Sequence, residues 1–125
     1  MRPRILVVDD EESMRNFVEC ALDAAGYDVV GASNGADALE CVERHPPFDL
    51  FIVDMVMPQM EGDELSRRLH RRDPDAKVLF LTGHSDRLFA QRQVLWENEV
   101  FLDKPVSLDG LLEGVALLLN GRLAR

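Results

Sequence analysis

The sequence is poor in basic residues: 14 Lys and Arg stand against 23 Asp and Glu, which leaves a net charge of −9. A surface that binds nucleic acid or an anionic membrane needs clustered Lys and Arg, so this charge argues against both kinds of partner. The one strongly basic run, RRLHRRD at 67–73, has acids on both sides. We expect it to be the solvated face of a helix.

Cysteine is also scarce, because the 125 residues include only Cys20 and Cys41. Both lie in helical patterns and neither has CxxC or Cys/His spacing. This pattern predicts two reduced structural thiols rather than a disulfide framework or a zinc site. The histidines His45, His70 and His84 share no metal-ligand spacing, and we expect them to be solvated.

Long apolar runs are missing as well. No stretch could span a bilayer, and the N-terminus, MRPRILVVDDEE, lacks the apolar core and cleavage site of a signal peptide. We therefore expect a cytoplasmic protein. The length suits one domain with a single core over residues 1–125, and a hydrophobic content of 46% is typical of a globular chain.

Apolar runs and amphipathic segments alternate along the chain, which predicts an α/β domain with a parallel sheet. Helix stop and cap signals, such as Gly26, Asn34 and Ser107, stand between them. A fourth helix, before the last strand, is less clear, because the apolar residues around Trp96 form no single stripe. The expected strands are 4–8, 28–33, 50–53, 77–81 and 100–102, and the clearest helices are 12–25, 35–44, 63–72 and 107–119.

The composition of the strands distinguishes central strands from edge strands. The first, third and fourth are apolar throughout, as strands covered on both faces are. The second contains Asp28, Gly31 and Ser33, and the fifth is short and bracketed by Glu99 and Asp103. These are features of edge strands, and the expected order 2-1-3-4-5 fits this division.

Polar residues follow the strands at their carboxyl ends, where such sheets bind ligands near the switch point. The first strand leads into Asp9 and Asp10, the third into Asp54, the fourth into Thr82 and the fifth into Lys104. Carboxylates held close together repel one another unless a cation lies between them, and ligand sets made of oxygen suit Mg²⁺. The metal and Lys104 would neutralise a phosphoryl group while Asp54 attacks phosphorus in line.

Four segments that together span the chain resemble the receiver domains of two-component response regulators. They are LVVDDE at 6–11, DMVMPQMEG at 54–62, LTG at 81–83 and FLDKP at 101–105. The resemblance implies a three-layer, doubly wound, flavodoxin-like fold with five helices. It also implies a phosphoprotein in phosphorelay signal transduction. Both a stand-alone receiver and a segment of a larger regulator or hybrid kinase fit this interpretation.

The resemblance implies a role for each matching residue. Asp54 is similar to the phosphoacceptor, which takes its phosphoryl group from a sensor histidine kinase or a phosphotransfer protein. Asp10 matches the direct Mg²⁺ ligand and Asp9 the acid that holds the metal through water. Asp54 and the backbone carbonyl of Val56 complete the expected metal ligands, and Lys104 would pair with phosphoryl oxygens.

The resemblance also implies a conformational switch. Thr82 would hydrogen-bond the phosphoryl group, and Phe101 would turn inward when Thr82 moves. This would change a face formed by the fourth helix, the fifth strand and the last helix, which is the expected output and homodimer surface. Val56 and His84 match positions that tune the phosphoryl lifetime, and the family has a cis peptide bond before the residue that Pro105 matches.

Two other functions compete with this hypothesis. A haloacid-dehalogenase-like phosphotransferase also uses a strand-end Asp nucleophile, but it needs a second acid two residues further on, where this chain has Val56. An interaction module that has lost phosphotransfer is disfavoured because the acids, the hydroxyl and the lysine are all present. We therefore expect a phosphoacceptor signalling domain, not an enzyme, with at most slow autodephosphorylation.

Overall fold

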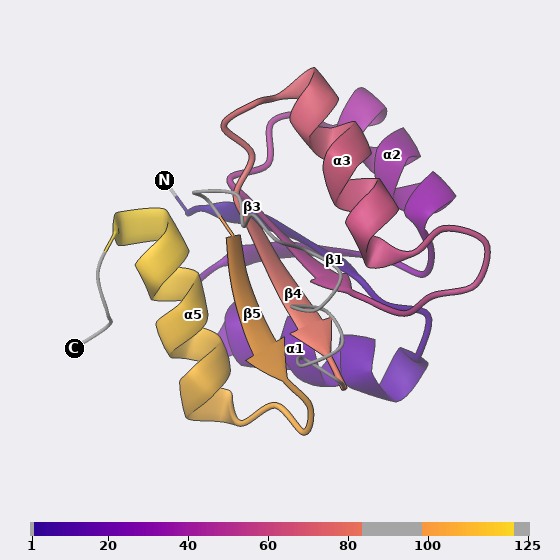
Figure 1. Cartoon of the computed structure of the whole chain (residues 1–125). Coiled ribbons are helices and arrows are strands. Elements are labelled where there is room, and N and C mark those ends of the chain that lie inside the picture. Colours follow the sequence, from indigo (N-terminus) through magenta and orange to yellow (C-terminus); the bar gives the residue numbers. More distant parts are fainter. Residues whose placement is uncertain (1, 84–98, 122–125) are drawn as a thin grey trace.

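Five parallel strands form one sheet in the order β2-β1-β3-β4-β5, as the sequence predicts. The computed structural model describes residues 2–83 and 99–121 (Figure 1). All four neighbouring strand pairs are parallel, and β1 pairs with both β2 and β3. The strands are β1 Arg4–Val8, β2 Asp28–Ala32, β3 Leu50–Asp54, β4 Val78–Thr82 and β5 Glu99–Asp103.

Helices cover both faces of the sheet, with α2 and α3 on one side and α1 and α5 on the other (Figure 1). This is the expected flavodoxin-like arrangement of three layers. The expected fourth helix falls on residues 84–98, outside the described residues. The four helices of the described part are α1 Glu12–Ala24, α2 Gly35–Arg44, α3 Gly62–Arg72 and α5 Leu108–Asn120. None of these helices is long and apolar enough to cross a membrane.

The predicted signals begin and end these helices. Asn34 Oδ1 accepts a hydrogen bond from the Asp37 backbone N–H at 2.7 Å, which caps α2. Ser107 Oγ accepts one from the Gly110 N–H at 3.0 Å and caps α5 in the same way. Gly26 follows α1 with a φ of 98°, a left-handed conformation that glycine adopts without the steric cost of a Cβ.

The alternation of strand side chains divides the core into two layers. Leu6 and Val8 pack on the α2 and α3 side of the sheet, whereas Ile5 and Val7 pack on the α1 and α5 side. Every residue of β3 and β4 is buried. The edge strands β2 and β5 are only partly buried, as their polar residues predict. The central strands therefore hold their carboxyl ends in fixed positions.

The expectation of a solvated His70 is wrong. His70 is buried, and its Nε2 lies 2.9 Å from the carbonyl oxygen of Ala76. Ser66, one turn earlier on α3, lies against the His70 ring and donates through Oγ to Glu99 Oε2 at 3.2 Å. The run at 67–73 is basic, but His70 follows Leu69 on the face of α3 that meets the sheet. The basic residues on both sides of His70 in the sequence made the whole run appear solvent-facing.

Gly62 packs directly against the strand that ends in Asp54. Its N–H donates to the Met55 carbonyl oxygen at 2.9 Å. A Cβ added at Gly62 would lie against the carbonyl oxygen of Asp54 and 2.9 Å from the Met55 Cα. Both neighbours are backbone atoms, which cannot move without shifting the end of β3.

We predict that Gly62→Ala lowers the free energy of unfolding by about 1–3 kcal/mol, as overpacked sites do. Urea unfolding of the two proteins would measure this. Gly83→Ala is the matched control, because an added Cβ there meets nothing within 4 Å. Equal stability losses for the two variants would contradict the proposed backbone contact.

Candidate functional site

Three acids meet at the carboxyl edge of the sheet. Asp9 follows β1, Asp10 follows it in turn, and Asp54 ends β3. One carboxylate oxygen from each lies within 4.8 Å of the others. Asp9 and Asp54 are buried, at 0% and 4% exposure, whereas Asp10 is exposed. The sequence predicts this cluster correctly, because the ends of neighbouring parallel strands lie at one edge.

Lys104, the residue after β5, joins the cluster. Its Nζ lies 3.1 Å from Asp54 Oδ1, and its backbone N–H donates to the Thr82 carbonyl oxygen at 2.8 Å. The peptide bond between Lys104 and Pro105 is cis, as expected. The Val56 N–H also donates to Asp54 Oδ1, at 3.4 Å. One oxygen of Asp54 therefore faces a cation and a backbone donor.

Burial and crowding set the charge of these acids. Burial raises the pKa of Asp9 to about 6, the Asp54 and Asp10 carboxylates add to this rise, and the Glu11 N–H and Lys104 oppose it. Burial also raises the pKa of Asp54, and Lys104 is the main group that opposes that rise. The two buried carboxylates thus differ, since only Asp54 has a direct cationic partner in the described part of the chain.

The donor set fits a hard divalent cation. Asp9 Oδ1 accepts a hydrogen bond from the Glu11 N–H at 2.9 Å. Asp9 Oδ2 is buried and has no hydrogen-bond partner among the described residues. A buried carboxylate oxygen without a donor is costly unless a cation meets it. Oxygen ligands from three acids suit Mg²⁺, so the cluster is compatible with that metal.

Of the remaining predicted residues, Thr82 and Val56 lie at this edge, whereas Phe101 lies in the middle of β5. Thr82 is buried at the end of β4, and Val56 is 67% exposed. Phe101 is partly buried and stacks on Phe80, with ring centroids 5.0 Å apart. His84 lies outside the described residues.

Sequence reasoning missed Arg15, whose Nη1 donates to the Asp9 carbonyl oxygen at 2.8 Å. A cation one turn into the helix that follows Asp9 and Asp10 is the only signal that points to it.

Comparison with known proteins gives a consistent picture. A family model described as response regulator receiver domain matches residues 5–116. The chain is 38% identical over 116 residues to the response regulator receiver protein CpdR of Brucella abortus, covering 93% of this chain and 96% of CpdR. It is 36% identical over 117 residues to the sensor kinase CckA of the same organism, covering 93% of this chain but only 12% of CckA.

A solved structure is also similar. The response regulator protein TrrA of Thermotoga maritima, in complex with Mg²⁺ and BeF, is 34% identical and superposes with a TM-score of 0.79. The match covers 94% of this chain and 99% of TrrA.

We predict that Asp9→Asn stabilises the metal-free protein at pH 7 by about 1–3 kcal/mol. Between the ordinary pKa of 3.8 and about 6, the folded protein holds a proton on Asp9 that the unfolded chain has released. The buried Asp9 carboxylate therefore lowers the stability of the folded protein fully above about pH 6, and it has no such effect below pH 3.8, where Asp9 is protonated in both states. The gain should fade as pH falls through this window.

Urea unfolding at pH 7 and near pH 4, with a chelator present, would measure the gain from Asp9→Asn. Asp10→Asn is the matched control, because Asp10 is exposed and its substitution should change stability less. A gain of the same size at both pH values would show that burial of the Asp9 charge is not its cause.

Proposed function

The chain belongs to the response regulator receiver domain family, and from this premise we propose that it accepts a phosphoryl group on Asp54. The observation that carries the proposal is the contact of 3.1 Å between Lys104 Nζ and Asp54 Oδ1, beside two further acids. A lysine-paired carboxylate is ready to act as a nucleophile, and its surroundings are suited to a group with several negative oxygens. The single domain is proposed to extend over residues 1–125.

In the proposed reaction, Asp54 attacks phosphorus through the carboxylate oxygen that Lys104 leaves open. A bond forms between that oxygen and phosphorus, and the bond from phosphorus to the donor nitrogen breaks. Lys104 then turns from Asp54 to a phosphoryl oxygen, and the Thr82 hydroxyl donates to another. Because the nucleophile must be ionised, the opposition of Lys104 to the raised pKa of Asp54 is part of this chemistry.

We assign the metal to Asp9, Asp10, Asp54 and the carbonyl of Val56. Bound Mg²⁺ would neutralise negative charge on the phosphoryl group as it moves to Asp54. The buried Asp9 Oδ2, which lacks a donor in the described part of the chain, supports this assignment. Asp10, more exposed than its neighbour, is open to direct coordination.

The phosphodonor in this proposal is a phosphohistidine on a sensor histidine kinase or a phosphotransfer protein. A matched relative named as a sensor kinase supports a kinase partner. Receiver domains are signalling domains, and we propose no turnover beyond slow autodephosphorylation.

The proposed switch couples Thr82 to Phe101. Phe101 is partly buried against Phe80, so an inward turn requires this stack to rearrange. The output face, and a homodimer through it, would consist of α5, β5 and the segment at 84–98, which lies outside the described residues. Sedimentation with and without Mg²⁺ and beryllofluoride tests the homodimer, and an unchanged sedimentation coefficient would exclude it.

The two alternative functions fit less well. Val56 stands where a haloacid-dehalogenase-like phosphotransferase needs its second acid, and it is an exposed apolar side chain. An interaction module without phosphotransfer would have no use for a lysine held against Asp54 beside two acids.

We predict that wild-type protein incubated with acetyl phosphate and Mg²⁺ gains one labile phosphoryl group, seen as a mass increase. Asp54→Asn should abolish the gain and keep the fold, because it removes the nucleophile and relieves crowding among the acids. Asp10→Ala should instead raise the Mg²⁺ concentration that the reaction requires. A wild-type rate of phosphorylation in Asp54→Asn would refute the assignment. Hydrolysis of an external phosphomonoester would favour the phosphotransferase.

We also predict that Val56 and His84 affect the phosphoryl lifetime to different degrees. Both positions lie two residues beyond a reacting side chain, Asp54 or Thr82. An imidazole can orient a water molecule, whereas the valine side chain cannot. The half-life of the phosphorylated protein should therefore change more in His84→Ala than in Val56→Ala. Equal half-lives for His84→Ala and the wild type would count against this role.

A further inference from the structure

The turn that carries Asp9 and Asp10 is held from two sides. The Asp9 N–H donates to the Ala32 carbonyl oxygen of β2 at 3.1 Å. The Asp9 carbonyl oxygen accepts from Arg15 Nη1 of α1 at 2.8 Å. Both backbone polar groups of this buried acid are therefore satisfied by elements outside the cluster of acids. Three carboxylates that repel one another tend to open such a turn, and these two bonds oppose that tendency.

Glu19 supports Arg15 from the next turn of α1. Arg15 Nε lies 4.0 Å from Glu19 Oε2, and the two side chains are only 20% and 30% exposed. An arginine four residues before a glutamate is the less favourable order for an ion pair on a helix. The pair is therefore expected to stabilise α1 only weakly. The Glu19 carboxylate instead helps to keep the guanidinium of Arg15 at the Asp9 carbonyl oxygen.

Gly31 leaves the space in which Glu19 lies. A Cβ added at Gly31 would lie 2.5 Å from Glu19 Oε1 and 2.9 Å from its Cδ. Gly31 is not among the glycines with positive φ, so its backbone conformation does not require glycine. Its role is the close approach of the Glu19 carboxylate to the edge strand.

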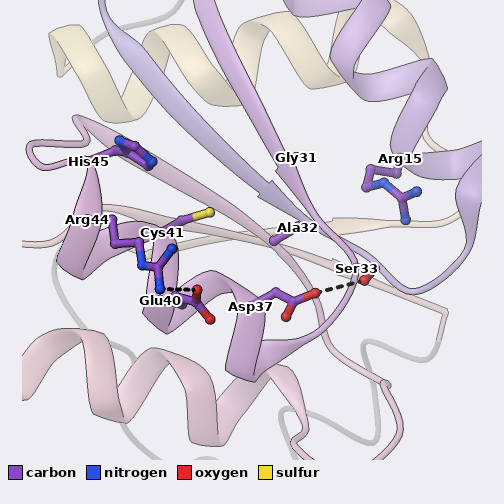
Figure 2. Close-up of a pocket in the computed structure, with 9 residues that line it drawn as sticks. All are labelled: Arg15, Gly31, Ala32, Ser33, Asp37, Glu40, Cys41, Arg44 and His45. Carbon is purple, nitrogen blue, oxygen red and sulfur yellow. Dashed lines mark hydrogen bonds and ion pairs between the residues drawn. The ribbon is translucent and has the colours of Figure 1, made fainter.

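Arg15, Gly31 and Ala32 line one open pocket of about 400 Å³. Figure 2 shows Arg15 on one side of this pocket and the Glu40–Arg44 pair on the other.

We propose that Arg15 is a positioning residue for the metal-binding acids, held by Glu19 in space that Gly31 leaves open. The inference rests on the proposed function, because it concerns the Mg²⁺ affinity of the Asp9 and Asp10 turn. Because the turn is already ordered, binding of the cation does not carry the entropic cost of ordering its carboxylates. Groups that orient metal ligands from outside the coordination shell typically change affinity by 10–100-fold.

Charge alone predicts the opposite effect. Arg15 is a cation near a proposed cation site, so removing its charge should strengthen Mg²⁺ binding by electrostatics. Removing a positioning group should weaken it. The sign of the change in Kd therefore separates the two roles.

The first test is Arg15→Met, measured by calorimetric titration of the full chain with MgCl₂. We expect the Kd to rise about tenfold. Arg44→Met is the matched control, because it removes the same charge from the same pocket and does not touch the turn. Its Kd should stay within roughly twofold of wild type in physiological salt. Arg15→Lys, which keeps the charge and one donor, should weaken binding less than Arg15→Met.

The second test changes no charge. In Gly31→Ala, the new methyl group displaces the flexible end of Glu19, which costs little stability but releases Arg15. We expect a raised Kd for Mg²⁺ with the urea midpoint of the metal-free protein nearly unchanged. In the Glu19→Ala background the same substitution should have no further effect on the Kd, because the displaced group is already gone.

The outcomes separate the two proposals. If the wild-type protein binds Mg²⁺ and the Kd is higher in Arg15→Met and Gly31→Ala, the positioning role is supported. If the wild-type protein binds Mg²⁺ and the Kd is equal or lower in both variants, that role is overturned and the proposed function stays intact. Absence of Mg²⁺ binding in the wild type overturns both.

Discussion

The contact between Lys104 and Asp54 is the interaction on which the rest of the site depends. Asp54 ends a strand whose every residue is buried, where an unpaired carboxylate is costly. Lys104 lies 3.1 Å away and balances part of that cost. Its backbone bond to Thr82 ties the loop after β5 to the end of β4. The position of the lysine therefore follows from the pairing of β4 with β5, and the sheet itself sets the charge balance at Asp54.

The opposite side of the site is held by hydrogen bonds rather than by an ion pair. Arg15 and Ala32 bind the backbone of Asp9 and leave its carboxylate for other partners. Asp9 Oδ2 is buried without a partner among the residues described. Such a group lowers the stability of the folded protein, and proteins accept such costs at functional sites. The buried carboxylate oxygen of Asp9 thus lowers the stability of the metal-free protein and at the same time is suited to contact a cation.

Sequence reasoning predicts what depends on periodicity and on strand ends. It gives the two edge strands, the caps at Asn34 and Ser107, and the meeting of Asp9, Asp10 and Asp54, because each follows from local chemistry or from parallel pairing. It does not give the burial of His70, whose ring contacts Ser66 and the Ala76 carbonyl oxygen in the folded protein. It also misses the contacts that link Gly31 to Glu19 and Glu19 to Arg15. A glycine can be recognised as leaving space for another side chain only when the structure shows which side chain lies there.

The two buried acids differ in a way that suits different tasks. A carboxylate nucleophile must stay ionised and must keep one oxygen free to attack. Lys104 beside Asp54 opposes the rise in the pKa of Asp54. In the proposed site Asp54 is both nucleophile and metal ligand, whereas Asp9 is proposed as a metal ligand alone and has no cationic side chain at its carboxylate among the described residues. Among the described residues the Asp9 carboxylate accepts a hydrogen bond only from a backbone N–H, and its pKa is raised to about 6, so a bound cation would offset much of the cost of its burial. The fold places Lys104 against the carboxylate of Asp54 and directs Arg15 to the backbone of Asp9, so the two buried acids have different electrostatic surroundings.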